Sequence, residues 1–298
     1  MVHRILFDGK RATGVVVESG GERFTVEGDE IVLSGGAIGS PHLLLLSGVG
    51  PAEHLRYAAV PLVADLPGVG QNLRDHLIMP ITLQTQSGFT QDENDPRIQV
   101  ALRYTAQGSD LRTDMIIYFW GFPQAPFGQA GDPERPSDPC VQMLAGINLA
   151  AGTGEIRLTS TDANVQTFLD FRFLEDPFDR QRLHEAVRLC VDLVSGGGFE
   201  GIVESRREPT DADLASDEAL DEWMMRTVTT SMHMAGTCKM GPSSDPMAVV
   251  DQYGRVHGIE GLRVADASVM PDCVRANTAT TTMMIGERVA DFIRLGEG

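Results

Sequence analysis

The sequence is poor in positive charge and in cysteine, and each shortage excludes a class of protein. Lys and Arg number 24 against 42 Asp and Glu, which gives a formal net charge of −18 over 298 residues. A chain this acidic is repelled by nucleic-acid phosphates and by anionic membranes, so we expect no nucleic-acid partner. The four cysteines are scattered without a CxxC pair, which is typical of a reducing compartment and predicts a cytoplasmic protein.

Long hydrophobic runs and metal-binding patterns are also missing. The longest purely aliphatic run is Leu43 to Leu46, whereas a membrane-spanning helix needs about 20 apolar residues. We therefore expect no integral membrane segment. No two of the seven histidines have the spacing of a zinc site, so we expect no metal. The 42% of hydrophobic residues instead indicate a globular chain with a large core.

The first 76 residues are typical of a nucleotide-binding sheet. Residues 14–18 and 22–26 predict a hairpin that turns at Ser19-Gly20-Gly21. Residues 30–33 then predict a short buried strand, followed by a glycine-rich turn and a helix with Ser40 as N-cap and Pro41 at its first position. A strand, a glycine turn and a helix in this order form one βα unit.

The middle of the chain is rich in strands, and its end returns to the βα pattern. Two amphipathic helices, capped by Asp176 and Ser216, follow the strands. A strand at 262–266 and a final helix preceded by Asn277 close the chain. The predicted strands of the middle part are 113–120, 140–149, 154–159 and 165–173, with a loop of glycine, proline and acidic residues at 128–139. The sequence thus predicts one α/β domain that is interrupted by a strand-rich insert.

His233 is a candidate general base. A neutral imidazole accepts a proton near pH 7, and the nearby Gly236 and Gly241 would let the main chain approach a flat ligand. Taken alone, a structural histidine is the more common case. A hydrolase that uses His233 with Cys238 is a further alternative, although five residues separate the two and a small buried thiol is the more common role of such a cysteine.

Two residues near the end of the chain are candidates for binding. Asn277 precedes the final helix, where an amide could donate to an oxyanion or could simply cap the helix. Asp266 ends its strand, and the carboxyl ends of strands in open α/β sheets line ligand crevices. An ordinary turn aspartate is the alternative for Asp266.

Four stretches together resemble the glucose-methanol-choline (GMC) oxidoreductase family. The first two resemble its second signature and the segment after it, the third its catalytic-histidine motif, and the fourth its C-terminal flavin-contact stretch. They read SGGAIGSPHLLLLSGVG at 34–50, DLPGVGQNLRDH at 65–76, TSMHMAGTCKMG at 230–241 and VVDQYGRVHGIEGLRVADASVMP at 249–271. The four motifs occur in the family's order along nearly the whole chain. The middle, from about residue 78 to 226, contains no family motif and resembles the family only in its general pattern of residues.

This resemblance implies a flavoenzyme that oxidises an alcohol with FAD. His233 falls on the family's main catalytic histidine and would remove the hydroxyl proton as hydride leaves the carbinol carbon. Asn277 falls on the second active-site position and would hydrogen-bond the substrate oxygen. The resemblance places further residues against the cofactor, namely Gly35, Gly36, Asp266, Ala267, Asn277, Thr278 and Ala279.

The implied fold is α/β (α+β): part of an FAD-binding doubly wound domain, interrupted by a mostly antiparallel substrate-binding sheet with flanking helices. The expected domains are 1–76 (part of the FAD-binding domain), 77–226 (substrate binding) and 227–298 (the C-terminal part of the FAD-binding domain with the catalytic residues). The partners implied are a small alcohol, an electron acceptor that the residues do not specify, and a missing N-terminal half or a second copy of the chain.

The start of the sequence departs from the family pattern. Members usually begin with a strand and a GxGxxG turn that binds the ADP part of FAD, and neither is read at the start of this chain. The expectation is therefore a C-terminal portion that is inactive alone. The alternative is a truncated or split-gene product that is not catalytic and functions only by associating with an N-terminal half.

Overall fold

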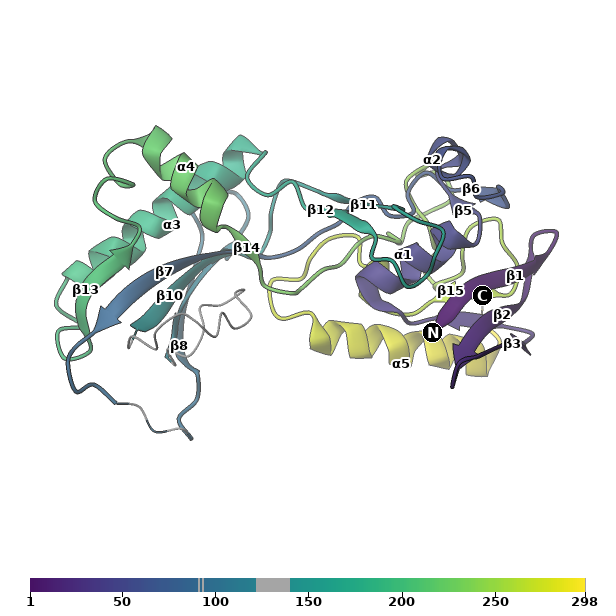
Figure 1. The fold of residues 1–298 in the computed structure, drawn as a ribbon, viewed down its shortest axis with the longest axis horizontal. Coiled ribbons are helices and arrows are strands. Elements are labelled where there is room, and N and C mark those ends of the chain that lie inside the picture. Colours follow the sequence, from purple (N-terminus) through teal and green to yellow (C-terminus); the bar gives the residue numbers. More distant parts are fainter. Residues whose placement is uncertain (91, 93, 122–139, 298) are drawn as a thin grey trace. The chain divides into compact units, whose positions relative to one another are not determined.

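The structure is a computed structural model that describes residues 1–90, 92, 94–121 and 140–297, so the loop expected at 128–139 lies outside it. The chain divides into two compact units (Figure 1). Unit 1 consists of Met1–Asp75, Thr153–Arg172 and His233–Gly298, and unit 2 of His76–Gly152 and Phe173–Met232. The α/β fold class, with a mostly antiparallel sheet in the insert, is confirmed.

The division differs from the expected domain ranges at His76, which belongs to unit 2, and in two longer stretches. Residues 227–232 belong to unit 2, and residues 153–172 belong to unit 1. Gly154 exchanges two main-chain hydrogen bonds of 2.9 Å with Leu73. Residues 153–172 are therefore paired with the first segment of unit 1. The returning stretch contains a small antiparallel pair, β11 (Glu155–Arg157) and β12 (Phe168–Asp170).

Unit 1 opens with an antiparallel sheet in the order β1-β2-β3. The predicted hairpin is present as β2 (Arg11–Ser19) and β3 (Glu22–Glu27). β1 (Val2–Asp8), which pairs with β2, is a strand that the sequence pattern does not predict. Register irregularities after Val2 and after Leu6 break the alternation of apolar and polar residues that identifies a strand.

Two short parallel pairs and three helices complete unit 1. β4 (Ile31–Leu33) pairs with β15 (Leu262–Val264), and β5 (Val49–Gly50) pairs with β6 (Ala64–Asp65). α1 (Gly36–Leu46) follows β4, and the 3₁₀ turn η1 (Ala267–Val269) follows β15, so two chain segments leave this pair at the same edge. The remaining helices are α2 (Ala52–Tyr57) and α5 (Ala279–Leu295).

The start of α1 corrects the sequence prediction. The helix begins at Gly36 with Gly35 as N-cap, so Ser40 and Pro41 lie inside it. Pro41 has no N–H with which to bond the carbonyl of Ala37 four residues earlier. The hydroxyl of Thr237 donates to that carbonyl at 2.6 Å instead, which satisfies the acceptor that proline leaves open.

Unit 2 is built around a six-stranded antiparallel sheet. The order is β13-β7-β10-β9-β8, and β14 also pairs with β7. The strands are β7 (Leu77–Thr85), β8 (Ile98–Tyr104), β9 (Met115–Trp120), β10 (Cys140–Ile147), β13 (Val203–Glu208) and β14 (Thr229–Thr230). Alternate residues of β7, β9 and β10 form one buried cluster with α3 (Pro177–Ser195) and α4 (Asp217–Thr227), which cover one face of the sheet (Figure 1).

The helices of unit 2 begin where the sequence predicts. The Asp176 carboxylate accepts a hydrogen bond from the N–H of Phe178, and Pro177 occupies the first position of α3. The Ser216 hydroxyl accepts from the N–H of Ala219 at the start of α4. Both N-caps are confirmed. Within the described ranges, no helix is both long and apolar enough to span a bilayer.

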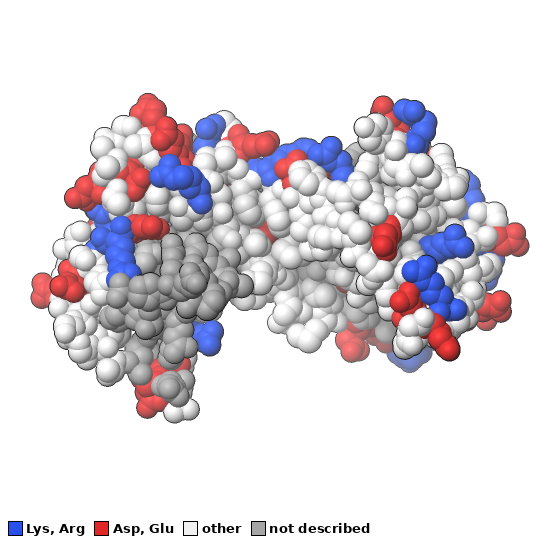
Figure 2. Space-filling view, viewed as in Figure 1, with Lys and Arg blue, Asp and Glu red and all other residues white. Residues whose placement is uncertain are grey.

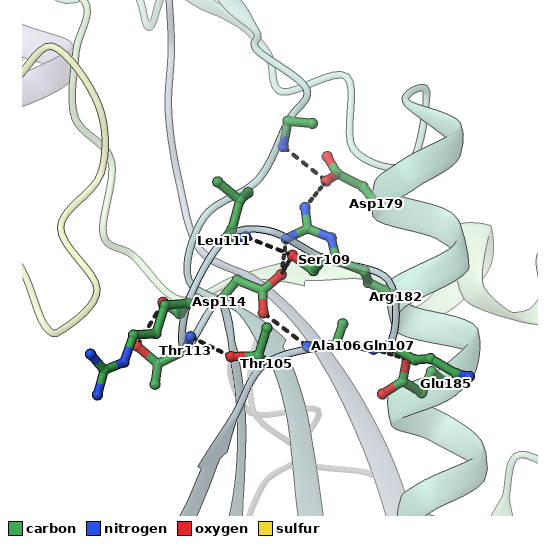
Figure 3. Close-up of polar contacts among 12 residues, drawn as sticks. Thr105, Ala106, Gln107, Ser109, Leu111, Thr113, Asp114, Asp179, Arg182 and Glu185 are labelled. Atoms are coloured by element: carbon green, nitrogen blue, oxygen red, sulfur yellow. Dashed lines mark hydrogen bonds and ion pairs between the residues drawn. The ribbon is translucent and has the colours of Figure 1, made fainter.

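A buried arginine links α3 to two loops of unit 2 (Figure 3). Arg182 is 1% exposed and pairs with Asp114 at 2.8 Å and with Asp179. Asp114 also accepts from the N–H of Ala106 and the hydroxyl of Ser109, whereas Asp179 accepts from two main-chain N–H groups at 151–152. Each buried charge is thus paired, as the low dielectric of an interior requires.

Acidic side chains on α4 and just before it are paired with basic side chains. Figure 2 shows acidic side chains over α4 with basic side chains beside them. Asp217 pairs with Arg188 at 2.5 Å, and Asp213 pairs with Arg226 at 3.3 Å. These carboxylates are solvated and partly balanced, so this run is a polar helix surface.

Candidate functional site

The segment that carries His233 runs through unit 1 alongside η1. The N–H of Gly236 donates to the carbonyl of Ala267 at 3.2 Å, and the N–H of Cys238 donates to the carbonyl of Ser268 at 2.8 Å. Residues 235–240 therefore lie directly beside the stretch that follows β15. The structure thus brings together two stretches that the sequence analysis proposed as catalytic and as cofactor-binding.

On its other side the same segment pairs with residues 72–75. Ala235 and Arg74 exchange two main-chain hydrogen bonds of 2.9 Å. Gly236 has a φ of +87°, and a Cβ at this position would lie 2.6 Å from the carbonyl oxygen of Asn72. Only glycine fits both the backbone conformation and the close approach. This packing explains the glycine three residues after His233.

His233 is half-buried, and burial lowers the pKa of its imidazole below the ordinary value. A lower pKa keeps the ring neutral at physiological pH, and a neutral ring nitrogen can accept a proton. The electrostatics of the site therefore suit a general base. The sequence alone could not distinguish this environment from that of a structural histidine.

Asn277 precedes α5 but does not cap it. The N-cap of α5 is Thr278, whose side chain accepts no hydrogen bond from the helix, and no acidic residue lies in the first turn. The capping alternative for Asn277 is therefore wrong. Asn277 is exposed, Thr278 is 9% exposed and Ala279 is exposed, so this end of the helix offers free main-chain N–H groups and the positive end of its dipole.

The loop that leads to Asn277 packs against the His233 segment. The thiol of Cys273 lies 3.8 Å from the carbonyl oxygen of His233. Burial raises the pKa of Cys273 to about 12, so this thiol stays protonated and neutral. Ala235, Ala267 and Cys273 belong to one small buried cluster, against which Ile285 of α5 packs. The two proposed catalytic positions thus come from segments that share one core.

Asp266 is engaged within the protein rather than free. It is 3% exposed, and its Oδ2 accepts hydrogen bonds from the N–H of Gly36 at 3.0 Å and from the hydroxyl of Ser40 at 2.5 Å. Its Oδ1 accepts from the N–H of Ser268 at 2.8 Å. The carboxylate therefore ties the N-terminus of α1 to η1, and it places Gly35, Gly36 and Ala267 in one region.

The two glycines of this region differ in their surroundings. A Cβ on Gly35 would lie 3.0 Å from the main chain of Gly39 and Ser40, whereas a Cβ on Gly36 would meet no atom of the described residues within 4 Å. Gly36 has a φ of +73°. Open space therefore lies beside the first residue of α1, where a ligand could approach the main chain.

Cys238 does not fit the hydrolase alternative. It is fully buried, and burial raises the pKa of its thiol well above the ordinary value. All four cysteines are free and buried. A thiol in this state is a small core side chain and not a nucleophile. Among the residues that the structure describes, no group of three or more His, Cys, Asp or Glu side chains is placed to hold a metal ion.

Comparisons with known proteins agree with these motifs. Residues 1–78 match the N-terminal model and residues 150–286 the C-terminal model of the GMC oxidoreductases. Oxygen-dependent choline dehydrogenase from Burkholderia multivorans is 34% identical over 324 residues, which cover 99% of this chain and 55% of that protein. The chain thus spans about half the length of the curated relatives that it matches.

Solved structures resemble the fold of the chain as well. Pyridoxine 4-oxidase from Mesorbium loti matches with a TM-score of 0.82 at 25% identity, over 97% of this chain and 56% of that one. A variant of Aspergillus oryzae formate oxidase, studied for the modification of its FAD, matches with a TM-score of 0.85 at 25% identity. That match covers 99% of this chain and 60% of the oxidase.

One expectation needs correction. The sequence predicts a C-terminal portion that lacks the N-terminal motif for the ADP part of FAD, yet the first 78 residues match the N-terminal model of the family. The match begins in the hairpin sheet β1-β2-β3 and runs through α1 and α2. With both models matched in order, and with nearly all residues of the four motifs in unit 1, the chain belongs to the GMC oxidoreductase family.

Proposed function

We propose that this chain carries the catalytic residues of an FAD-dependent enzyme that oxidises an alcohol by hydride transfer, with His233 as the general base. The observation that carries the proposal is the half-buried His233, whose pKa is lowered by burial and whose segment is hydrogen-bonded to η1 and packed against Ile285 of α5. The choline dehydrogenases and the FAD-containing oxidase to which the chain is similar support the same chemistry.

Two features of unit 1 fit a flavin. The N-terminus of α5 has no side-chain cap and no acidic residue in its first turn, so it can face a ring system that gains negative charge. Open space lies beside the left-handed Gly36. Asn277, Thr278 and Ala279 would hold the ring end of the cofactor, and Gly35, Gly36 and Ala267 would lie nearer its nucleotide end. When bound, FAD supplies the acceptor for the hydride.

The residues of the chain supply the proton chemistry. The hydroxyl proton of the substrate moves to an unprotonated ring nitrogen of His233, while the electron pair of the carbinol C–H bond leaves as hydride and a carbonyl group forms. The side-chain N–H of Asn277 donates to the substrate oxygen as negative charge develops there. The protonated His233 then adds a positive charge next to the same oxygen.

The visible spectrum of the flavin tests this proposal. The chain, together with the further polypeptide segment with which we infer that it associates, is supplied with FAD, freed of unbound flavin and mixed without oxygen with a panel of alcohols, choline and pyridoxine among them. Bleaching of the flavin band by one or more alcohols, and its loss in His233→Ala, is the expected result. Bleaching at an undiminished rate in His233→Ala would remove His233 from the role of base.

A second proposal concerns the chain by itself. We infer that it does not turn over alcohol alone and that it functions by associating with a further polypeptide segment. Within the described residues β4 and β15 pair only with each other, and Val32 in the middle of β4 is 41% exposed, whereas parallel strands are normally covered on both faces. The relatives are nearly twice as long as this chain, which supports the same proposal.

The isolated chain decides this second proposal. It is purified and titrated with FAD, and bound flavin is measured after gel filtration. We expect substoichiometric flavin and no alcohol-dependent bleaching. Stoichiometric flavin that an alcohol reduces in the isolated chain would contradict it, and would leave the proposed alcohol oxidation intact.

A further inference from the structure

A buried carboxylate holds the main chain of His233. Asp75 is 3% exposed, and its Oδ1 accepts a hydrogen bond from the N–H of His233 at 3.0 Å. The two residues are 158 positions apart, and both belong to unit 1. A buried carboxylate is costly unless hydrogen bonds compensate it, so this contact is a specific one.

The neighbours of Asp75 hold the rest of the same segment. The main-chain N–H of Arg74 donates to the carbonyl of Ala235, and the N–H of Ala235 donates to the carbonyl of Arg74. The side-chain N–H of Asn72 donates at 3.2 Å both to the carbonyl of Gly236 and to the carbonyl of Pro271, where the loop to Asn277 begins. Residues 72–75 therefore form a strap along residues 233–236. Within this strap, the bond to the N–H of His233 comes from a side chain and can be removed by substitution.

The contact acts on position rather than on proton affinity. A nearby carboxylate would favour the protonated imidazole and raise the pKa of His233. Burial instead lowers the pKa of His233. Asp75 accepts a hydrogen bond from the main-chain N–H of His233, and this bond fixes the position of the main chain from which the ring extends.

We propose that Asp75 is a positioning residue for His233, which it holds by the main-chain N–H so that the ring keeps one orientation. The proposal rests on the proposed function, in which His233 is the base. A base must lie within hydrogen-bond reach of the proton that it removes, and a displacement of about 1 Å can cost about 10²-fold in rate. The strap is thus part of the catalytic geometry.

Three variants of the full chain test the contact without any cofactor. Asp75→Ala removes the acceptor, whereas Asp75→Asn keeps an oxygen at the same place and removes the charge. Asp65→Ala is the matched control, because Asp65 also accepts one main-chain bond of 3.0 Å in unit 1, from the N–H of Ala52. Amide hydrogen exchange at His233 and the NMR signal of its ring are measured in each, with His233→Ala to assign the ring signal.

We expect exchange at the His233 amide to be about 10- to 100-fold faster in Asp75→Ala, and its ring signal to broaden or split. Asp75→Asn restores a single ring signal and exchange near that of the wild type, and Asp65→Ala changes neither. Unchanged exchange in Asp75→Ala overturns the proposal. Faster exchange throughout unit 1, at the Val264 amide as well, in both Asp75 variants indicates a merely structural role and also overturns it.

Turnover of the flavin-loaded enzyme separates this proposal from the proposed function. We expect Asp75→Ala to lower kcat about 10- to 100-fold with KM nearly unchanged, and to lower it no further in the His233→Ala background. Wild-type turnover in Asp75→Ala, together with a large loss in His233→Ala, overturns only the positioning role. Undiminished turnover in His233→Ala overturns the role of His233 as base.

Discussion

The hydroxyl of Ser40 donates a hydrogen bond of 2.5 Å to Oδ2 of Asp266, a residue 226 positions later in the chain. Through this bond the first turns of α1 and the residues after β15 are held as one piece. Ser40 is 1% exposed and Asp266 is 3% exposed, so water cannot replace either partner. The family motifs that contain these two residues meet at this bond.

Removal of the Asp266 carboxylate is expected to destabilise unit 1. Asp266→Ala leaves the N–H of Gly36, the hydroxyl of Ser40 and the N–H of Ser268 without their acceptor. Because an unsatisfied buried donor costs roughly 1–3 kcal/mol, we expect a loss of about 3 kcal/mol in the free energy of unfolding. Urea denaturation measures it. Asp65→Ala, which removes one exposed bond, should cost only about 1 kcal/mol, and equal losses in the two variants would contradict this account.

Substitution of His233 is expected to abolish most of the turnover. His233→Ala should lower kcat by about 10² or more, which is the usual size of general-base catalysis. Because burial lowers the pKa of His233, the rate of the wild type should rise with pH along a limb centred below the ordinary value of about 6.5. His3→Gln, on β1, serves as the control and should keep both the rate and the limb. A loss below threefold in His233→Ala would exclude the base role.

Asn277→Asp should separate catalysis from stability. A carboxylate near the substrate oxygen repels the developing alkoxide, so we expect turnover to fall by about 10². The same charge lies at the positive end of the α5 dipole, where it should stabilise the helix by about 0.3–1 kcal/mol. In this one variant we thus expect the turnover rate to fall while the midpoint of thermal unfolding rises. If turnover is retained, Asn277 has no part in the chemistry.

Arg182 in unit 2 provides a prediction that is independent of the candidate site. Arg182→Met leaves the carboxylates of Asp114 and Asp179 buried without their cation. Breaking a buried ion pair in this way costs about 3–5 kcal/mol. Arg188→Met on the same helix removes an exposed pair with Asp217 and should cost at most about 1 kcal/mol. Comparable destabilisation of the two variants would mean that the buried ion pairs contribute no more to the free energy of unfolding than the exposed one does.

The same network predicts a dependence of stability on pH. Burial alone would raise the pKa of Asp114, but hydrogen bonds from Ser109, Arg182 and the N–H of Ala106 outweigh it and hold the pKa below the ordinary value. A carboxylate with a depressed folded-state pKa contributes stability above its unfolded-state pKa, and that contribution is lost as the pH falls through the folded-state pKa. The stability difference between the wild type and Asp114→Asn should therefore be constant near pH 7 and shrink below about pH 4. A difference that does not change with pH would refute this.

The sequence predicts local structure best where one residue determines it. Asp176 and Ser216 are N-caps because an oxygen two or three residues before a free N–H is enough to start a helix. Ser40-Pro41 has the same local pattern and misleads, since the helix begins earlier and the hydroxyl of Thr237 replaces the missing donor of Pro41. That replacement comes from nearly 200 residues away, where no local pattern can reveal it.

Strand β7 shows a similar limit. Pro80 argues against a central strand, and the sequence analysis did not predict one there. The structure places Pro80 between the residues of β7 that pair with β14 (77–78) and those that pair with β13 (82–85). In the candidate site, His233, Asn277 and Asp266 are found from family motifs, whereas the supporting contacts of Asn72 and Asp75 depend on tertiary pairing and were missed.

The bond between Asp75 and His233 also has a consequence for how the enzyme could diversify. Asp75 is the last residue of unit 1 before the chain first enters unit 2, and His233 is the first residue after it finally leaves. The two residues of unit 1 that flank the insert are thus joined by a hydrogen bond within unit 1. A graft that exchanges residues 76–152 and 173–232 but retains 153–172 would keep unit 1 whole, with His233, the loop to Asn277 and the bridge of Asp266 in place.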